Sequence, residues 1–136
     1  MVEGPVQAEN VALARRSFEL FSEGGVEAAR PSWAEDCIWH DPPDFPDADS
    51  YFGPDAVAER LEEIWDILPL DGLGIEETIA LGKANVLLIL GFKDPSAGAR
   101  VAADQSIGCI VTVKDGKVRE WRPYLKHETA RRAAGL

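Results

Sequence analysis

The chain has 136 residues, of which 46% are hydrophobic and 28% are charged. This length predicts a single domain over residues 1–136 with one real core, and the composition argues against global disorder. Lys and Arg number 14 against 24 Asp and Glu, so the formal net charge is -10. Because phosphate groups would be repelled, nucleic acid and anionic membranes are disfavoured as main partners.

The cysteine content and the longest apolar run indicate the compartment. No stretch without a charge is longer than the one from Ala84 to Phe92, which is far short of the roughly 20 residues of a membrane-spanning helix. The first five residues contain no basic and apolar leader. Cys37 and Cys109 are the only cysteines, and in a chain with a real core they predict reduced thiols. We therefore expect a cytoplasmic protein.

The first element is predicted to be a helix over residues 10–21. Val11, Ala14, Phe18 and Phe21 recur at helical spacing, and Asn10 is a candidate N-cap. Two glycines at 24–25 predict its end. A short second helix is predicted over residues 26–33, with a proline at 31 that is tolerated only near an end.

A strand, a loop and a third helix are predicted next. The strand covers Cys37 to His40 and ends at Asp41, which two prolines follow. Residues 44–53 are rich in Asp and Pro, which is typical of a loop. A helix is predicted from Pro54 to about Leu68, with an apolar stripe and a proline after its end.

The rest of the chain predicts an antiparallel meander. Strands are expected over residues 75–81, 86–93, 100–113 and 117–125, because these runs are rich in β-branched and apolar residues. Asp115-Gly116 predicts a type I′ hairpin turn. Helices followed by consecutive strands indicate an α+β fold, with the three N-terminal helices packed on one face of a strongly curved, mostly antiparallel sheet.

Asp41 is the strongest candidate for chemistry. Alternation along the strand puts Cys37, Trp39 and Asp41 on one face, and Ile38 and His40 on the other. A carboxylate beside Trp39 in an apolar cavity would be poorly solvated, which would raise its pKa and make it a base near neutral pH. The alternative is a carboxylate that caps the turn through the prolines, and the local sequence favours that reading.

Metal and histidine chemistry have weaker support. Asp44, Asp47 and Asp49 lack the glycine and distal glutamate of an EF-hand loop, so we expect a solvated acidic loop without metal. His40 and Asp41 are neighbours on a strand and point to opposite faces, so we expect a hydrogen-bonded histidine at a surface or interface. His127 lies in a charged tail and is expected to face solvent.

Apolar residues from several predicted elements share one face and could line a cavity for a small apolar metabolite. We expect this substrate-binding face to contain Gln105, whose amide needs partners among apolar neighbours, together with Phe18, Trp39, Trp65, Phe92, Cys109, Trp121 and Leu125. Core packing is the alternative for each, and it is strongly preferred for Leu90 and Val111. Arg122 and Tyr124 share the opposite parity, which suits contact between two sheets in a homodimer.

The order of these motifs resembles a known family. The relevant segments are Trp39-His40-Asp41-Pro42, residues 53–57, residues 115–124 around the last predicted strand, and the final residues 133–136. Together they resemble a SnoaL-like protein of the nuclear-transport-factor-2-like superfamily, which includes ketosteroid isomerases, limonene-epoxide hydrolases and polyketide cyclases. The resemblance implies a cone-shaped α+β barrel, open at one end, with a mostly apolar cavity and usually a dimer.

The resemblance carries only part of each known active site. The ketosteroid isomerase base falls on Asp41, but its two oxyanion donors fall on Phe18 and Cys109, neither of which is a good donor. At the Asp-Arg-Asp positions of the epoxide hydrolases this chain has Leu90, Phe92 and Pro123. Trp39 and Asp41 stand where that family has its water-orienting Tyr and Asn. Pro123 also stands where polyketide cyclases tend to carry an acid.

Two functions follow from these residues. The first is a cofactor-independent isomerase, cyclase or lyase that acts on a small apolar metabolite, with Asp41 as its general base and Gln105 positioning the substrate. The second is a non-catalytic module that binds a hydrophobic ligand or dimerises. The missing polar groups favour the second function, and Asp41 favours the first.

Overall fold

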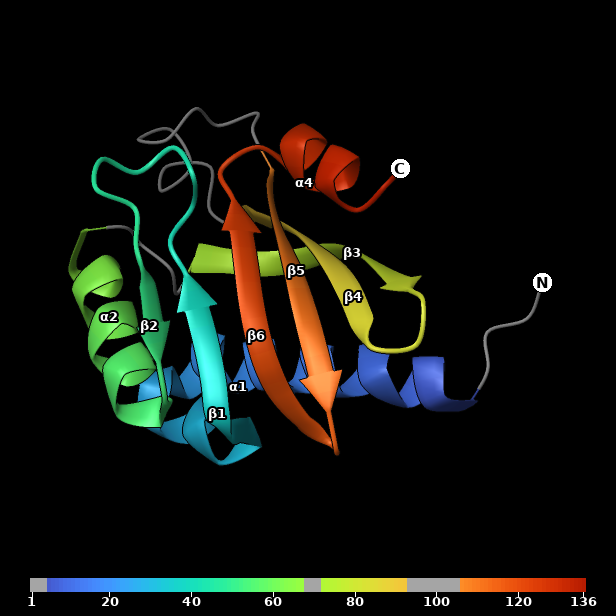
Figure 1. Ribbon diagram of the computed structural model, residues 1–136, viewed down its shortest axis with the longest axis horizontal. Helices are drawn as coiled ribbons and strands as arrows, with labels where there is room; N and C mark the ends of the chain where they lie inside the picture. Colours follow the sequence, from blue (N-terminus) through green and yellow to red (C-terminus); the bar gives the residue numbers. More distant parts are fainter. Residues whose placement is uncertain (1–4, 68–71, 93–105) are drawn as a thin grey trace.

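The computed structural model describes residues 5–67, 72–92 and 106–136. A six-stranded sheet forms the centre of the molecule, and helices cover both of its faces (Figure 1). In chain order the elements are α1 (Pro5–Ala29), the 3-10 helix η1 (Arg30–Ser32), β1 (Trp33–His40), β2 (Ser50–Phe52), α2 (Pro54–Ile67), β3 (Leu73–Leu81), β4 (Asn85–Phe92), β5 (Ile107–Lys114), β6 (Lys117–Tyr124) and α4 (His127–Ala133). Within the described ranges, no helix is both long and apolar enough to cross a membrane.

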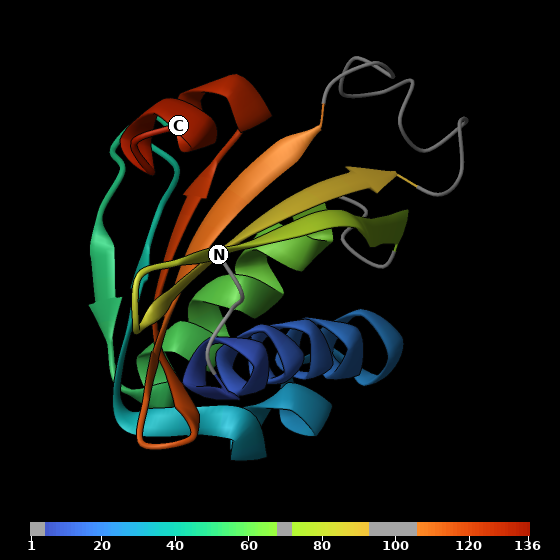
Figure 2. The ribbon, with the colours of Figure 1, turned by 90° about the vertical axis from the view of Figure 1, so that its right-hand side faces the viewer.

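The strands follow the order β2-β1-β6-β5-β4-β3. Every neighbouring pair is antiparallel except β1 and β6, which run parallel with Trp39 opposite Trp121. The sheet curves around α1 and α2, and α4 lies on its other side (Figure 2). We call the face toward α1 and α2 the inner face and the face toward α4 the outer face. The α+β fold with a curved, mostly antiparallel sheet is confirmed.

The first helix is longer than the sequence predicts. α1 begins at Pro5, so Asn10 lies inside the helix and is not its N-cap. The Asn10 side chain donates instead from Nδ2 to the Lys83 carbonyl at 2.7 Å. The predicted break is confirmed at Gly25, where φ is 81° and the backbone leaves helical geometry. The predicted second helix is the end of α1 followed by η1, and Pro31 lies within that short turn.

Two elements were not predicted from the sequence. β2 lies in the segment predicted to be a loop, and its three residues are too few to show a strand pattern. α4 lies in the charged tail, and its Ala130 is fully buried against the outer face. The Cβ of Ala130 would lie 2.3 Å from a Cβ at position 108, so only Gly108 allows this approach.

The predicted meander is confirmed with shifted ends. β3 begins at Leu73 instead of Ile75, and β5 is described from Ile107 onward. The predicted strand residues 93 and 100–105, and the predicted helix end at Leu68, lie outside the described residues. Asp115 and Gly116 have φ values of 52° and 74°, the sign that a type I′ turn requires.

Alternation along the strands separates two apolar clusters. On the inner face, Leu88 and Val118 belong to the main core, which α1 and α2 complete. On the outer face, Leu87 and Ile110 pack against Ala130 of α4. Full burial of such a side chain contributes about 1.5–3 kcal/mol. The inner face therefore carries the larger core, and that core is hollow.

Candidate functional site

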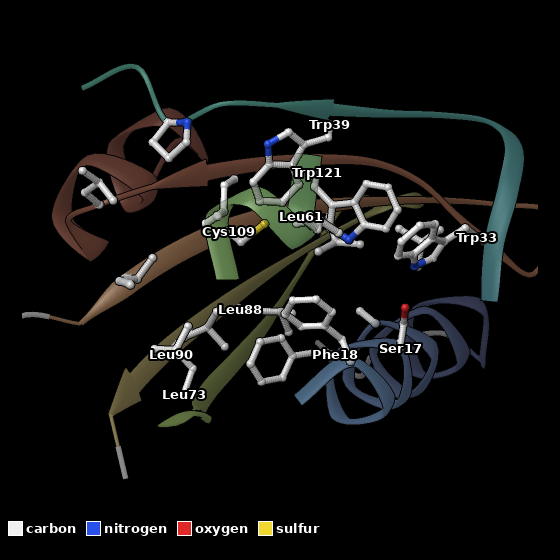
Figure 3. A pocket seen from close by; sticks show the side chains of 18 of the residues that line it. Ser17, Phe18, Trp33, Trp39, Leu61, Leu73, Leu88, Leu90, Cys109 and Trp121 are labelled. Carbon is white, nitrogen blue, oxygen red and sulfur yellow. The ribbon is translucent and has the colours of Figure 1, made fainter. Parts of the chain in front are cut away.

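A cavity of about 120 Å³ lies between the inner face of the sheet and the two helices, α1 and α2 (Figure 3). α1 and α2 contribute one wall, and the strands β1, β3, β4, β5 and β6 contribute the other. Pro42 and Phe45, from the segment after β1, complete it. The lining consists of Ala14, Ser17, Phe18, Phe21, Trp33, Trp39, Pro42, Phe45, Leu61, Ile64, Leu73, Leu88, Leu90, Ile107, Cys109, Val111, Val118, Trp121 and Leu125.

Most of the predicted ligand-binding side chains meet in this cavity. The lining includes Phe18, Trp39, Cys109, Trp121 and Leu125. It also includes Leu90 and Val111, for which core packing was preferred. Residues 17, 33 and 73 were not expected there, because helical or strand alternation alone does not show where packed side chains leave space.

Three predicted residues are not placed in the lining. Trp65 packs edge-on against Phe21, with ring centroids 4.8 Å apart, and is absent from the cavity wall. Gln105 lies outside the described residues. Phe92 is the last residue of β4, and its side chain also lies outside what is described.

The cavity holds few polar groups. No charged side chain is found among the described residues that line it. The Ser17 hydroxyl shares a hydrogen bond of 2.7 Å with the Ser32 hydroxyl, which itself donates to the Ala29 carbonyl. Burial raises the pKa of the Cys109 thiol to about 12, so this thiol stays protonated at neutral pH and is no thiolate nucleophile.

Three tryptophans form one side of the cavity (Figure 3). The Trp33 and Trp121 rings meet edge to face with centroids 5.2 Å apart, and the Trp39 ring lies 6.4 Å from Trp121. Trp39 donates its indole N–H to Asp41 at 3.1 Å. Within the described part of the chain, neither Trp33 nor Trp121 has an indole hydrogen bond, so both N–H groups can meet an acceptor on a ligand.

Asp41 is buried at the end of β1 and is surrounded by donors. Arg60 of α2 binds it with two parallel hydrogen bonds, Nε to Oδ1 at 2.9 Å and a terminal nitrogen to Oδ2 at 3.0 Å. Besides Trp39, the backbone N–H of Asp49 donates to Oδ2 at 3.2 Å. Tyr51 stacks under the Arg60 guanidinium, with 5.3 Å between the ring centroid and the guanidinium carbon. The carboxylate is thus fully paired, and Asp41 does not line the cavity.

The expected rise in the pKa of Asp41 is wrong. Burial by itself would raise this pKa, but the hydrogen bonds from Arg60, Trp39 and the Asp49 backbone outweigh burial and lower it. Asp41 also closes the following segment, since its backbone N–H donates to the Asp49 carbonyl at 2.9 Å. The turn-capping interpretation therefore describes its contacts better than the desolvated base does.

Arg60 is the residue of this site that sequence reasoning missed. A usable signal was present, because Arg60 falls at helical spacing with Val57, Leu61 and Ile64 of the apolar stripe on α2. A cation on that stripe is half-buried and needs a partner. Asp41 is the acid that supplies it.

Neither histidine lines the cavity. His40 lies on the outer face and has partners at both ring nitrogens, 2.6 Å from Ser50 Oγ and 2.6 Å from Glu120 Oε2. His127 was expected to face solvent, but it is only one-third exposed at the start of α4, and its Nδ1 accepts a hydrogen bond of 3.3 Å from Arg131 Nε. No group of three potential metal ligands occurs among the residues whose positions are described.

The solved structures that resemble this chain share its fold. An NTF2-like protein from Burkholderia xenovorans is 21% identical, with a TM-score of 0.59 over 93% of this chain and 96% of that one. A protein provisionally described as a polyketide cyclase, from Sinorhizobium meliloti, is 14% identical, with a TM-score of 0.61 over 82% and 93%. An LEH-like epoxide hydrolase from Mycobacterium tuberculosis is 15% identical, with a TM-score of 0.61 over 97% and 89%. No curated protein matches the chain.

The curved sheet, its covering helices and the apolar hollow between them define an NTF2-like fold. Residues 14–121 match the model of the SnoaL-like domain, and the chain belongs to that family. The resemblance drawn from the sequence is confirmed. Family membership fixes the fold and not the reaction, because the site decides the chemistry.

Proposed function

We propose that this protein binds a small, uncharged and largely apolar molecule in the inner cavity. The observation that carries the proposal is the apolar lining of the cavity, which has no charged side chain among its described residues. A cavity of similar size, about 150 Å³ and lined by aliphatic and aromatic side chains, stays dry and binds benzene. A ligand of about one six-membered ring therefore suits the 120 Å³ found here.

Polar recognition in this cavity is limited to weak donors. The unpartnered indole groups of Trp33 and Trp121 suit a carbonyl, ether or hydroxyl oxygen on the ligand. A charged ligand would lose its hydration without gaining an ion pair, which costs several kcal/mol. We therefore expect the cavity to bind an uncharged molecule and to reject charged molecules of similar size.

Three probes that each carry one benzene ring and one small substituent test this expectation: toluene, benzoate and benzylamine. We expect toluene to raise the thermal unfolding temperature and to change tryptophan fluorescence, because it binds the folded state alone. Benzoate and the benzylammonium ion should do neither. Equal stabilisation by toluene and benzoate would contradict the proposal, and so would no response to toluene at saturation.

Two substitutions at one position provide the matched control. Leu88 lines the cavity from β4. The larger side chain of Leu88→Phe fills part of the cavity and should weaken toluene binding tenfold or more. Leu88→Met conserves the side-chain volume, lowers the free energy of unfolding by less than about 1.5 kcal/mol and should retain binding. Loss of binding in both variants, or in neither, would place the toluene elsewhere.

The second candidate is a cofactor-independent isomerase, cyclase or lyase with Asp41 as general base. Its support is Trp39, which lines the cavity and donates to Asp41, linking the hollow to a carboxylate. Against it stand the lowered pKa and the ion pair with Arg60, which leave the carboxylate a weak base. In any assay that shows turnover, unchanged activity of Asp41→Asn would rule this role out.

A further inference from the structure

Ser50, His40 and Glu120 form a hydrogen-bonded row across three adjacent strands of the outer face. Ser50 of β2 and His40 of β1 are direct partners in the antiparallel ladder. Glu120 of β6 lies on the other side of His40, across the parallel pair. The row is separate from the cavity, because none of these three residues lines it.

The partners of His40 fix its tautomer. An ionised carboxylate can only accept, so Nε2 carries the proton and donates to Glu120 Oε2 at 2.6 Å. In the neutral imidazole Nδ1 is then the acceptor for the Ser50 hydroxyl, also at 2.6 Å. A hydroxyl within hydrogen-bond reach of an imidazole, which a third group orients, is the arrangement that activates a nucleophile.

We propose that Ser50 is an acyl-accepting nucleophile, with His40 as its general base and Glu120 as the residue that positions the imidazole. In the step, His40 Nδ1 takes the Ser50 hydroxyl proton while Oγ bonds to the carbonyl carbon of an ester. The bond from that carbon to the leaving oxygen breaks, and its electron pair departs with an alkoxide or phenolate, which takes up the proton. In the second step the same nitrogen takes a proton from water, whose oxygen bonds to the acyl carbon. The bond from that carbon to Ser50 Oγ breaks, Oγ takes the proton back, and the acyl group leaves as a carboxylic acid.

The surroundings of Ser50 select the class of ester. Phe52 follows two residues later on the same face, is 67% exposed, and pairs in register with Ile38. This apolar pair beside the hydroxyl suits an aromatic leaving group. The His40 and Glu120 side chains are 33% and 26% exposed in the single chain, so the row is open to a small molecule where no second copy covers the outer face. The substrate class is a small aryl ester.

The rate of this chemistry should be modest. The backbone N–H of Ser50 donates to Asp49 Oδ1 at 2.8 Å and is not free to stabilise an oxyanion. One oxyanion donor contributes about 10²–10³ in rate. We therefore expect slow acylation of a single serine, detected as a covalent adduct, and not rapid turnover.

The test uses p-nitrophenyl acetate on the full chain, with peptide mapping by mass spectrometry. The protein is kept dilute enough to sediment as a monomer, because a second copy is also predicted to meet the outer face. Ser106 is the internal control, since its hydroxyl bonds to the Glu76 carboxylate without an imidazole. We expect one acetyl group on Ser50 well before any on Ser106. Equal labelling of both serines would overturn the proposal.

Variants separate general-base activation from simple exposure. His40→Gln should slow acetylation of Ser50 by about a hundredfold or more, the usual contribution of a general base, and Ser50→Ala should abolish it. His127→Gln is the matched control, because the two histidine side chains are equally exposed at 33% and 34%. A wild-type labelling rate in folded His40→Gln would overturn the proposal. If that variant does not fold, the comparison of Ser50 with Ser106 decides.

Discussion

At the scale of single residues, Asp41 shows how a partner reverses the effect of burial. Its side chain is fully buried, a position that raises the pKa of an unpaired carboxyl. Arg60 is 18% exposed and supplies two parallel hydrogen bonds, so the pair is held in one geometry. The pair fastens α2 to the end of β1, next to the cavity.

Removal of Arg60 should therefore be costly. We expect Arg60→Ala to lower the free energy of unfolding by about 3–5 kcal/mol, because it leaves a buried carboxylate unpaired. Arg30→Ala is the control, since its partner Asp55 is 95% exposed and such pairs contribute at most about 1 kcal/mol. Urea denaturation measures both. A loss no larger for Arg60→Ala than for Arg30→Ala would contradict this assignment.

The same ion pair predicts a pH dependence. The pKa of Asp41 lies below its ordinary 3.8 in the folded state because Arg60, Trp39 and Asp49 donate to the carboxylate. The unfolded chain thus binds this proton more tightly, so the stabilisation is complete above the ordinary pKa and is lost as the pH falls through the folded value. We expect the stability difference between wild type and Asp41→Asn to be largest near neutral pH and to shrink below about pH 4. Denaturation at a series of pH values checks this, and a constant difference would refute it.

At the scale of elements, the sequence predicts what depends on local pattern. The long strands β3 to β6, the helix α2 and the Asp115-Gly116 turn follow from alternation, helical spacing and turn chemistry. β2 does not, because its existence depends on the β1 edge that it meets. α4 does not either, because a single alanine at 130 packed on Gly108 provides its burial.

The candidate site divides along the same line. Phe18, Trp39 and Trp121 could be assigned to one hollow because alternation and a family resemblance both place them inward. The ion pair of Asp41 could not be predicted, since Arg60 lies 19 residues away in the chain and meets Asp41 only after α2 packs on β1. A single sequence does not show which distant residue will pair with a given charged side chain.

At the scale of the whole molecule, a homodimer remains our prediction. Arg122 lies on the outer face, and its Nε is buried with no hydrogen-bond partner among the described residues. Such a donor is costly to leave unpaired, so we expect the Arg122 side chain to turn toward a carbonyl or carboxylate that a second copy brings to the outer face. We expect the wild type to sediment as a dimer at micromolar concentration and Arg122→Ala to dissociate more readily. A wild-type monomer throughout that range would contradict the prediction.

The parallel contact between β1 and β6 bears on how the molecule is made. β1 is synthesised before β2 to β5, yet its neighbour β6 leaves the ribosome only after all of them. Until β6 arrives, the β1–β2 ribbon has no sheet to join. Such distant pairing slows folding, because a long loop must close before any contact offsets the lost entropy. A nascent chain that stops before β6 thus exposes the apolar inner face of an incomplete sheet, and chaperones bind such exposed apolar surface.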